Sequence, residues 1–574
     1  MQEKIQRWLN EPMLDATLKN ELLSLSDAEL SDAFYKDVSF GTGGIRGVIG
    51  VGTNRLNIYT VRKALVGFSR YLLKTNPNIK TEGIVIAYDN RHNNVLFAHT
   101  CVGVLAAHGI KSYLFDSLRP TPLLSFAVRE LKAGGGIMIT ASHNPPKYNG
   151  LKMYDREGCQ LVPALANQVI EEVQAIDNLF SLNSLPYEEA DARGLVDIIG
   201  RAVDQAYLEA LAPLKPSDDS KKKLKVVFTP LHGTAREVGL RALSEAGFTV
   251  SVVESQMVTD PDFKTVKSPN PENQSAFELA ESLGHETKAD LLIATDPDAD
   301  RLGIAVRHHD QYVYLNGNQT GALLIDYLAR KHQKEGTTPK HGIVYTTIVT
   351  SDFGPAIAAS YGFEVRRTLT GFKYIGEQMA AIEKEASSFV MGYEESYGYV
   401  LHDIVRDKDA IQALLVCAYM AEEALSENKT LVDVLETLYE RHGHYADHLM
   451  NIELEGQVGE AHIQAIMSHF RKVWPEAYLN QSCLIKEDYL TLTRTDHNGK
   501  EEALHYPEEN VLKFIFRDFW FVLRPSGTEP KLKVYLMHRG AQTKEETYVL
   551  LATLRKQLQR EIDEVIASRK DLTE

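Results

Sequence analysis

Three stretches of the chain repeat one pattern of apolar and polar positions. Each has a short β-branched run, a helix-like stretch, a glycine before a second apolar run, and a last apolar run that enters a polar loop. The repeats run from Ile84 through Gly109 to Ser142, from Val226 through Gly247 to Asp296, and from Ile343 through Gly362 to Glu394. Apolar strands that alternate with helices predict an α/β fold with parallel strands covered on both faces. Ligands of such sheets bind beyond the carboxyl ends of the strands, where all three polar loops fall.

The last part of the chain has a different pattern. WFVLRPSGTEPKLKVYLM alternates like an antiparallel strand pair with a tight turn at Ser526-Gly527, and a stretch with helical spacing follows from Lys544 to about Arg569. This pattern predicts a smaller α+β domain after three related mixed α/β sheet domains. Polar and glycine-containing breaks place the expected domains at 1–213, 214–316, 317–443 and 444–574.

Composition narrows the class of protein. A chain of 574 residues is expected to form roughly three to four domains. Its content of 44% hydrophobic and 24% charged residues is ordinary for a globular protein. No apolar stretch approaches the ~18 residues of a membrane span, and the charged start lacks a signal-peptide core. The four cysteines form no CxxC pair, so we expect neither a zinc ribbon nor a disulfide framework, and a cytoplasmic location.

The net charge of −16 makes the chain a poor general binder of nucleic acid or of an anionic membrane. An anionic ligand would therefore need cations that are concentrated locally. This condition applies to each of the loops below.

The first loop, TASHNPPKYNGLK (140–152), places Ser142 directly after an apolar strand, with His143 beside it and two prolines that prevent a regular helix. A serine held there can accept a phosphoryl or acyl group if a base and a charge stabiliser are near. The string is not the G-x-S-x-G elbow of hydrolases, which disfavours acyl transfer. The alternative is a serine that only shapes a turn.

The second loop, TDPDADR (295–301), offers carboxylates at alternate positions, Asp296, Asp298 and Asp300. Such a density of hard oxygen ligands fits Mg²⁺ together with a phosphate oxygen. An EF-hand is excluded because its sixth and twelfth positions hold Arg301 and Arg307 rather than glycine and glutamate. The alternative is a solvated acidic turn. Arg301 is placed to neutralise a phosphate.

The remaining polar strings add hydrogen-bonding groups and cations. In GYEESYG (392–398), Glu394 and Ser396 can bind vicinal hydroxyls of a sugar, although acidic loops are common. RPSGTEPKLK (524–533) offers a guanidinium, hydroxyls and backbone amides as a phosphate cradle, or forms an ordinary hairpin turn. FGTGGIRG (40–47) is glycine-rich without a Walker motif. Nearby, RDKDA (406–410) adds Arg406 and Lys408, and TGFKYIG (370–376) adds Lys373. With Arg46, Lys152, Arg301 and Arg524, these are the candidate cations for an anionic ligand.

Together these strings resemble the α-D-phosphohexomutase superfamily over nearly the whole chain. The resemblance implies four domains around a central cleft, three related α/β domains and a smaller C-terminal α+β one. It implies that Ser142 carries the phosphoryl group with His143 assisting, that Ser142 and the three aspartates hold Mg²⁺, and that Arg46 and Lys152 lie near the reacting oxygen. It further implies Lys408 as acid/base, and as substrate-binding residues Arg301, Lys373, Glu394, Ser396, Arg406, Arg524, Ser526, Gly527 and Thr528.

The activity that the resemblance implies is reversible conversion of glucose 1-phosphate to glucose 6-phosphate through glucose 1,6-bisphosphate, by a monomer or homodimer. Lys408 or Lys152 could serve as the base if neighbouring cations lower its pKa. The string EESYG favours glucose over mannose as the sugar. Ala410 stands where the branch of the superfamily that acts on glucose phosphates commonly has glycine. Mannose and pentose phosphates stay open, as do an aspartyl-phosphate phosphotransferase and a catalytically silent sugar-phosphate sensor.

Overall fold

The protein is described here from a computed structural model. It describes residues 1–38, 40–41, 44–217, 222–383, 385–454, 456–475, 477–526, 531–540 and 543–568. The chain divides into two compact units, one of residues 1–345 and 371–432 and the other of residues 346–370 and 433–574. Among the residues described, no helix is both long and apolar enough to cross a membrane.

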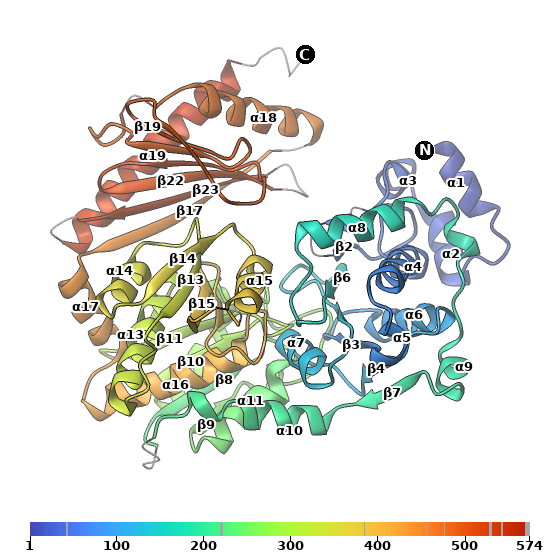
Figure 1. Ribbon diagram of the computed structural model, residues 1–574, viewed down its shortest axis with the longest axis horizontal. Coiled ribbons are helices and arrows are strands. Elements are labelled where there is room, and N and C mark those ends of the chain that lie inside the picture. Colours follow the sequence, from blue (N-terminus) through green and yellow to red (C-terminus); the bar gives the residue numbers. More distant parts are fainter. Residues whose placement is uncertain are drawn as a thin grey trace. The chain divides into compact units, whose positions relative to one another are not determined.

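The first sheet of unit 1 has seven strands in the order β1-β2-β6-β5-β3-β4-β7 (Figure 1). The parallel strands β3, β4, β5 and β7 stand at its centre and one edge, and β6 and β2 run antiparallel to their neighbours. The strands are β1 (Phe40–Gly41), β2 (Gly44–Val48), β3 (Ile84–Tyr88), β4 (Ser112–Phe115), β5 (Gly136–Ile139), β6 (Tyr148–Tyr154) and β7 (Val196–Ile199).

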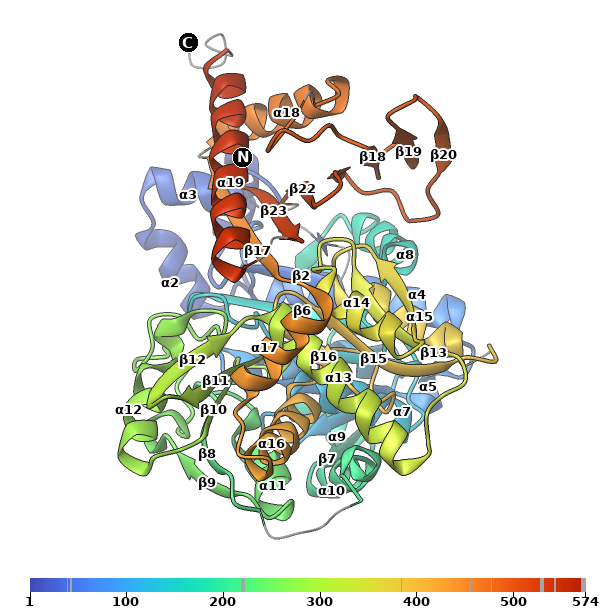
Figure 2. The same ribbon diagram turned by 90° about the vertical axis from the view of Figure 1, so that its left-hand side faces the viewer.

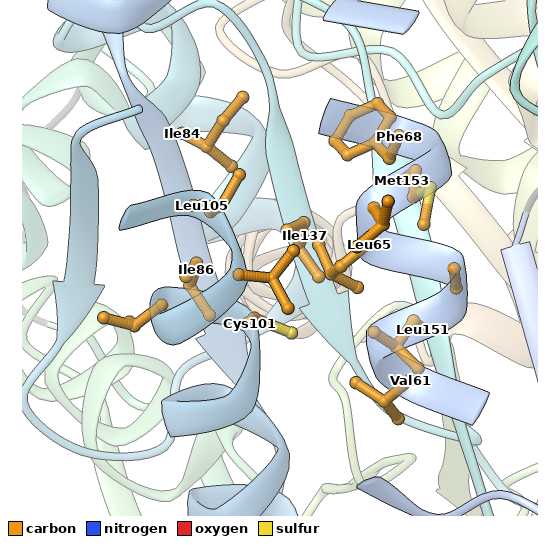
Figure 3. Packing of buried hydrophobic residues seen from close by; sticks show 14 of the residues in the cluster. Val61, Leu65, Phe68, Ile84, Ile86, Cys101, Leu105, Ile137, Leu151 and Met153 are labelled. Carbon is orange, nitrogen blue, oxygen red and sulfur yellow. The ribbon is translucent and has the colours of Figure 1, made fainter. Parts of the chain in front are cut away.

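A continuous apolar core fixes this sheet against its helices. Figure 3 shows Leu65 of α4 (Ile58–Thr75) beside Ile137 of β5, Val61 of α4 beside Leu151 of β6, and Leu105 of α6 (Asn94–Ala107) beside Ile84 of β3. Each of these side chains is fully or almost fully buried, and burying one aliphatic side chain stabilises the fold by roughly 1.5–3 kcal/mol. The β-branched strands are buried on both faces because α7 (Thr121–Glu130) packs against β3 and β5 as well.

The N-terminal residues form three short helices on this first domain. They are α1 (Gln2–Leu9), α2 (Ala16–Ser24) and α3 (Asp27–Phe34). Trp8 is buried among Phe34, Tyr59 and Phe180, each in an edge-to-face contact. These helices were not predicted from the sequence pattern.

The second sheet has the order β12-β11-β10-β8-β9, with β8, β9 and β10 parallel and β11 and β12 antiparallel. Figure 2 shows α12 (Glu278–Thr287) on one side of it and α16 (Ala410–Ser426) on the other. The elements are β8 (Lys225–Thr229), α11 (Ala235–Glu245), β9 (Thr249–Val252), β10 (Leu291–Thr295), β11 (Leu302–His308) and β12 (Gln311–Leu315). The helix α16 thus follows the third repeat in sequence but packs on the second sheet and on α11.

The third repeat supplies β13 (Gly342–Thr347) and β15 (Ser388–Glu394), which are parallel, and β16 (Gly398–Val400), which is antiparallel to β15. The helices α13 (Gly317–Glu335) and α15 (Phe372–Ile382) pack on β15. Asn316 and Gln319 form a capping box at the start of α13, and Gly336 ends it in the left-handed conformation.

Unit 2 contains an antiparallel sheet in the order β17-β23-β22-β21-β18-β19-β20. The helices α18 (Gly456–Lys472) and α19 (Lys544–Ala567) pack on one face of it (Figure 1). The predicted strand pair is confirmed as β22 (Phe519–Pro525) and β23 (Lys531–Arg539), and the predicted final helix as α19. Its other strands are β17 (Tyr445–Glu453), β18 (Ile485–Asp488), β19 (Thr493–Asp496), β20 (Glu501–Ala503) and β21 (Leu512–Ile515); unit 2 also holds α14 (Phe353–Ser360), β14 (Glu364–Thr368) and most of α17 (Leu431–His442).

The α/β fold class is therefore confirmed, with mixed sheets in the three repeats and an antiparallel C-terminal sheet. A feature that the apolar pattern did not predict is common to the repeats. In each, the last parallel strand returns at once as an antiparallel neighbour, β5 to β6, β10 to β11 and β15 to β16. The three polar loops are these returns.

Candidate active site

The three return loops share a backbone feature. Each contains one residue other than glycine with positive φ, Ser142 at 50°, Ala299 at 54° and Tyr397 at 67°. Such residues are uncommon and often lie at functional sites, because the left-handed conformation crowds Cβ. Here it turns the chain sharply from one strand into the next.

Backbone hydrogen bonds join the aspartate loop to its neighbours within unit 1. The amide of Leu302 donates to the carbonyl of Tyr397 at 3.0 Å, and the amide of Ala410 donates to the carbonyl of Ala299 at 3.2 Å. From the first domain, the amide of Thr121 donates to the carbonyl of Asp298 at 2.8 Å. The aspartate loop is therefore the point at which segments from all three repeats meet.

Ser142 is buried, and its hydroxyl faces the aspartate loop. Its Oγ donates to Asp296 Oδ2 at 2.6 Å and lies 3.1 Å from His143 Nδ1. Its amide donates to Thr140 Oγ1 at 2.8 Å, which fixes the left-handed turn. A single carboxylate and a single imidazole thus contact the hydroxyl that the sequence singled out.

Arg91 binds the backbone of the loop that carries Ser142, the serine loop (140–147). Its buried guanidinium donates four hydrogen bonds to backbone carbonyls, to Ser142 at 2.6 Å, Asn144 at 2.6 Å, Pro145 at 3.0 Å and Tyr148 at 2.9 Å. The fork-shaped guanidinium suits such multiple contacts better than an ammonium does.

Asp89 completes this support. Its Oδ2 lies 3.4 Å from Arg91 Nε and accepts from Thr140 Oγ1 at 2.6 Å, and its Oδ1 accepts from the Arg91 amide at 3.0 Å. The sequence analysis missed this pair. A signal was present, because DNR follows β3 directly, at the same sheet edge as the serine loop.

The three aspartates form the one group of this kind found among the described residues. Carboxylate oxygens of Asp296, Asp298 and Asp300 lie within 4.8 Å of one another, and all three side chains are buried. Asp298 Oδ1 and Asp300 Oδ1 have no hydrogen-bond partner within the described part of the chain. Buried, unpartnered carboxylate oxygens are costly unless a cation binds them, so this donor set fits a divalent metal ion.

The charged groups of the site change the pKa values of Asp296 and Asp300 in opposite directions. Burial and the carboxylates of Asp298 and Asp300 raise the pKa of Asp296 well above its usual value. Burial also opposes ionisation of Asp300, but Lys408, Lys152 and Arg301 lower its pKa below the usual range. Asp300 is thus the carboxylate most strongly held as an anion.

Two lysines converge on Asp300. Lys152 Nζ lies 2.8 Å from Asp298 Oδ2 and 3.2 Å from Asp300 Oδ2, and Lys408 Nζ lies 3.0 Å from the same Asp300 oxygen. Burial disfavours both ammonium groups, yet the adjacent carboxylates raise the pKa of Lys152 and of Lys408. The condition under which either lysine could serve as the base, a pKa lowered by nearby cations, is therefore not met in this arrangement, because the carboxylates are closer than the cations.

The other cations and His143 surround this cluster. Arg301 donates from its backbone amide to Asp296 Oδ1 at 2.9 Å, and its guanidinium pairs with Glu272. Arg46 donates to Asn144 Oδ1 at 3.0 Å, from the strand that pairs with β6. Burial and the charges of Arg301 and Arg46 lower the pKa of His143 well below its usual value, so its imidazole is neutral near pH 7.

Glycines allow Arg46 to approach the serine loop. A Cβ at Gly44, where φ is 135°, would lie 1.8 Å from the Leu151 carbonyl oxygen, and one at Gly150 would lie 2.5 Å from the Ile45 carbonyl oxygen. The close pairing of β2 with β6 therefore requires residues without side chains at these positions.

Comparison with known proteins identifies the family. Models described as Phosphoglucomutase/phosphomannomutase match in order along the chain, alpha/beta/alpha domain I at residues 37–180, domain II at 205–309, domain III at 316–442 and the C-terminal domain at 485–548. The chain belongs to the phosphoglucomutase/phosphomannomutase family. The resemblance to α-D-phosphohexomutases is thereby confirmed.

Relatives within the phosphoglucomutase/phosphomannomutase family cover most of the chain. A phosphoglucomutase of Staphylococcus haemolyticus (strain JCSC1435) is 40% identical over 506 residues, which are 88% of this chain and 90% of that protein. A phosphoglucomutase of Staphylococcus epidermidis is 38% identical over 538 residues, 90% and 96% of the two chains.

Solved structures share the fold. The open form of pp63/parafusin, a phosphoglucomutase from Paramecium, aligns with a TM-score of 0.66 at 18% identity over 92% of this chain and 95% of its own. A phosphoglucomutase/phosphomannomutase family protein from Burkholderia thailandensis gives a TM-score of 0.63 at 16% identity, over 92% and 97%.

The loop predicted to bind the sugar lies beside Lys408 in unit 1. Glu394, at the end of β15, is buried and accepts from the Gly371 amide at 2.8 Å, which joins it to the start of α15, the helix that carries Lys373. Ser396 lies half-buried in the turn that follows. Gly398 packs against the stem of Lys408, since a Cβ there would lie 2.2 Å from Lys408 Cδ.

Arg406 has its partners outside the aspartate cluster. Its guanidinium is fully buried, bonds to the carbonyl of Asp403 and pairs with Glu383, which Arg129 also contacts at 3.4 Å. The groups that act on its charge are these neighbours and not the aspartate cluster. Arg406 therefore holds its loop in this structure, and its role in binding substrate stays a prediction.

The predicted phosphate loop lies in unit 2. Arg524 Nε donates to Glu509 Oε1 at 2.9 Å, and the Ser526 amide donates to the Lys531 carbonyl at 2.7 Å, at the ends of β22 and β23. Gly527 and Thr528 lie outside the described residues. The role of this loop stays a prediction.

Proposed function

We propose that this chain is a phosphoglucomutase that interconverts α-D-glucose 1-phosphate and glucose 6-phosphate, with Ser142 as the phosphoryl carrier. The observation that carries the proposal is the contact of Ser142 Oγ with Asp296, inside a cluster of three aspartates and two lysines. The 38–40% identity to phosphoglucomutases over most of the chain supports the same activity.

The proposed reaction balances without a co-substrate. In the first step the bond between phosphorus and Ser142 Oγ breaks and a bond from phosphorus to the free hydroxyl oxygen of the sugar phosphate forms. The proton of that hydroxyl passes to a base, and Ser142 Oγ takes up a proton from an acid. The product is glucose 1,6-bisphosphate. After it reverses its orientation, Ser142 Oγ takes the other phosphoryl group back, so the enzyme returns to its starting state.

The residues that would hold Mg²⁺ are Asp296, Asp298, Asp300 and the oxygen on Ser142. The unpartnered oxygens of Asp298 and Asp300 support this set. When bound, the ion supplies positive charge that stabilises the transferred phosphoryl oxygens. The chain itself adds the ammonium groups of Lys152 and Lys408, both of which face this cluster.

The raised pKa values of the two lysines keep both as ammonium groups, which favours charge stabilisation over proton abstraction. Lys408 is proposed to donate a proton to the departing oxygen and to recover it in the reverse step, since a phosphotransferase that works in both directions needs one group in both roles. His143, neutral and 3.1 Å from Ser142 Oγ, is placed to accept that hydroxyl's proton. Arg46 is proposed to lie near the reacting oxygen.

The substrate is proposed to bind by its hydroxyls and by its second phosphate. Glu394 and Ser396 would bind the sugar hydroxyls, with Lys373 and Arg301 as neighbouring cations. Arg524, Ser526, Gly527 and Thr528 would hold the phosphate that does not react. Glucose 1,6-bisphosphate would serve as intermediate and activator.

The place of action is proposed to be the cytosol, with the chain as a monomer or homodimer. Its four cysteines are buried and unpaired, as is usual in a reducing compartment.

A coupled assay tests the sugar. Glucose 1-phosphate, mannose 1-phosphate and ribose 1-phosphate would be compared at equal concentration with Mg²⁺ and trace sugar bisphosphate. The proposal expects kcat/KM to be highest for glucose 1-phosphate and turnover to vanish in Ser142→Ala. A higher kcat/KM for mannose 1-phosphate or ribose 1-phosphate would instead favour a phosphomannomutase or a phosphopentomutase.

A further inference from the structure

Two buried aspartates flank Lys408, and each accepts a hydrogen bond from a tyrosine, one on β6 and the other on α10 (Arg201–Ala210). Tyr154 Oη donates to Asp407 Oδ2 at 2.7 Å, and Tyr207 Oη donates to Asp409 Oδ2 at 2.7 Å. All four side chains are almost completely buried. The loop that carries Lys408 is therefore tied to β6 on one side of the lysine and to α10 on the other.

The two aspartates differ in what else they contact. Asp407 Oδ1 accepts from the Lys408 amide at 2.8 Å and lies 3.9 Å from Lys408 Nζ. Asp409 Oδ1 instead accepts from the amides of Ile411 and Gln412 at 2.9 and 3.0 Å and so caps α16. Only Asp407 is close enough to compete with Asp300 for the Lys408 ammonium.

Strand β6 links both lysines of the site. Lys152 and Tyr154 are two residues apart on β6, so their side chains point to the same face of the sheet. Lys152 reaches Asp300 directly at 3.2 Å, and Tyr154 reaches Asp407, the neighbour of Lys408. One strand thus sets the place of one lysine directly and of the other through an aspartate.

We infer that Tyr154 is a positioning residue for phosphoryl transfer, which holds the Asp407 carboxylate so that the Lys408 ammonium stays on Asp300. The hydroxyl occupies Asp407 Oδ2 and fixes the direction in which the carboxylate points. Burial and Asp407 raise the pKa of Tyr154, so the phenol remains a donor. The inference rests on the proposed function, because it assumes that Lys408 takes part in turnover.

Removing only the hydroxyl of Tyr154 should change the position of the Lys408 ammonium. In Tyr154→Phe the ring still fills its place, but Asp407 loses one donor. Its carboxylate is then free to close the 3.9 Å gap to Lys408 Nζ and to draw the ammonium away from Asp300, which it now contacts at 3.0 Å. A misplaced charged group of this kind lowers kcat roughly tenfold to hundredfold.

The experiment compares Tyr154→Phe with Tyr207→Phe, which removes the same kind of bond, of the same length, two residues further along the loop. Both variants should show similar falls in melting temperature. Only Tyr154→Phe should lower kcat, with KM for glucose 1-phosphate changed less than about twofold, since substrate contacts remain. In a Lys408→Met background, Tyr154→Phe should lower kcat no further.

Equal loss of kcat in the two tyrosine variants would overturn the inference, as would no loss in Tyr154→Phe or an additive loss in the Lys408→Met background. A Lys408→Met variant with unchanged kcat would also overturn it. These outcomes differ from failure of the proposed function, which would appear as no mutase turnover in the unaltered protein or as full turnover in Ser142→Ala.

Discussion

Replacing Arg91 with lysine should disable the serine loop while the chemistry-bearing side chains remain unchanged. Arg91 donates to four backbone carbonyls at 2.6–3.0 Å from a fully buried guanidinium. The single nitrogen of a lysine cannot reach carbonyls that are spread over Ser142, Asn144, Pro145 and Tyr148. We expect at least two of them to lose their donor, because an ammonium has three hydrogens at one point.

The size of the effect follows from these lost bonds. A buried polar group left without a partner costs about 1–3 kcal/mol, so two unpaired carbonyls lower the free energy of unfolding by roughly 2–6 kcal/mol. The lysine charge can still pair with Asp89, whose Oδ2 lies 3.4 Å from Arg91 Nε in the unaltered protein, so no isolated buried charge is added. A shift of the serine hydroxyl by about 1 Å would lower kcat roughly a hundredfold.

The assay measures urea unfolding and the rate at which glucose 1,6-bisphosphate phosphorylates Ser142. Arg330→Lys is the control, since Arg330 pairs with Asp326 and Glu423 on the helices α13 and α16 and contacts nothing in the serine loop. We expect both variants to lose stability and only Arg91→Lys to lose phosphorylation rate. If Arg91→Lys phosphorylates Ser142 within about twofold of Arg330→Lys, the support assigned to Arg91 is refuted.

Three further variants test separate parts of the account. Asp298→Asn should remove most of the stabilisation by Mg²⁺, which in the unaltered protein reaches about 2.7 kcal/mol at a hundred times Kd; equal Mg²⁺-dependent shifts in melting temperature would contradict the assigned ligands. Gly398→Ala should lower kcat by displacing Lys408 Cδ, 2.2 Å from the added methyl, and an unchanged kcat would argue against that packing. Burial lowers the pKa of Lys513 to about 8, so the unfolded chain binds this proton more tightly and stability should rise by about 1.4 kcal/mol per unit from pH 8 towards 10.5; Lys513→Met, followed by urea unfolding, should lack this rise, and equal slopes would count against it.

The parallel strands and the polar residues of the loops after them could be predicted from the sequence. Parallel strands buried on both faces give continuous β-branched runs, and the polar residues that follow them, such as Ser142 and Asp296, mark the carboxyl edge of a sheet. The antiparallel direction of β6, β11 and β16 could not be predicted from the sequence, because the loops before these strands carry no hairpin-turn signal.

The side-chain contacts of the site were less predictable. Arg406 was expected to bind substrate because it is a cation in a polar loop, but loop residues have no periodicity that fixes their direction, and its guanidinium points to Glu383. The pKa values of Lys152 and Lys408 could not be inferred either. The sequence shows which cations and anions lie in neighbouring loops, but not how far apart they are. The short distances to Asp298 and Asp300 decide whether the pKa of each lysine is raised or lowered. The tyrosines that hold Asp407 and Asp409 come from β6 and α10 (Arg201–Ala210), far away in sequence.

Whether Ser142 carries phosphate is the most direct test of the account. The purified protein would be incubated with glucose 1,6-bisphosphate and Mg²⁺, and its intact mass and peptide masses measured before and after acid treatment. The account predicts one acid-stable phosphoryl group for each chain, on Ser142, and none in Ser142→Ala. An acid-labile phosphate on Asp296, or no added phosphate at all, would contradict it.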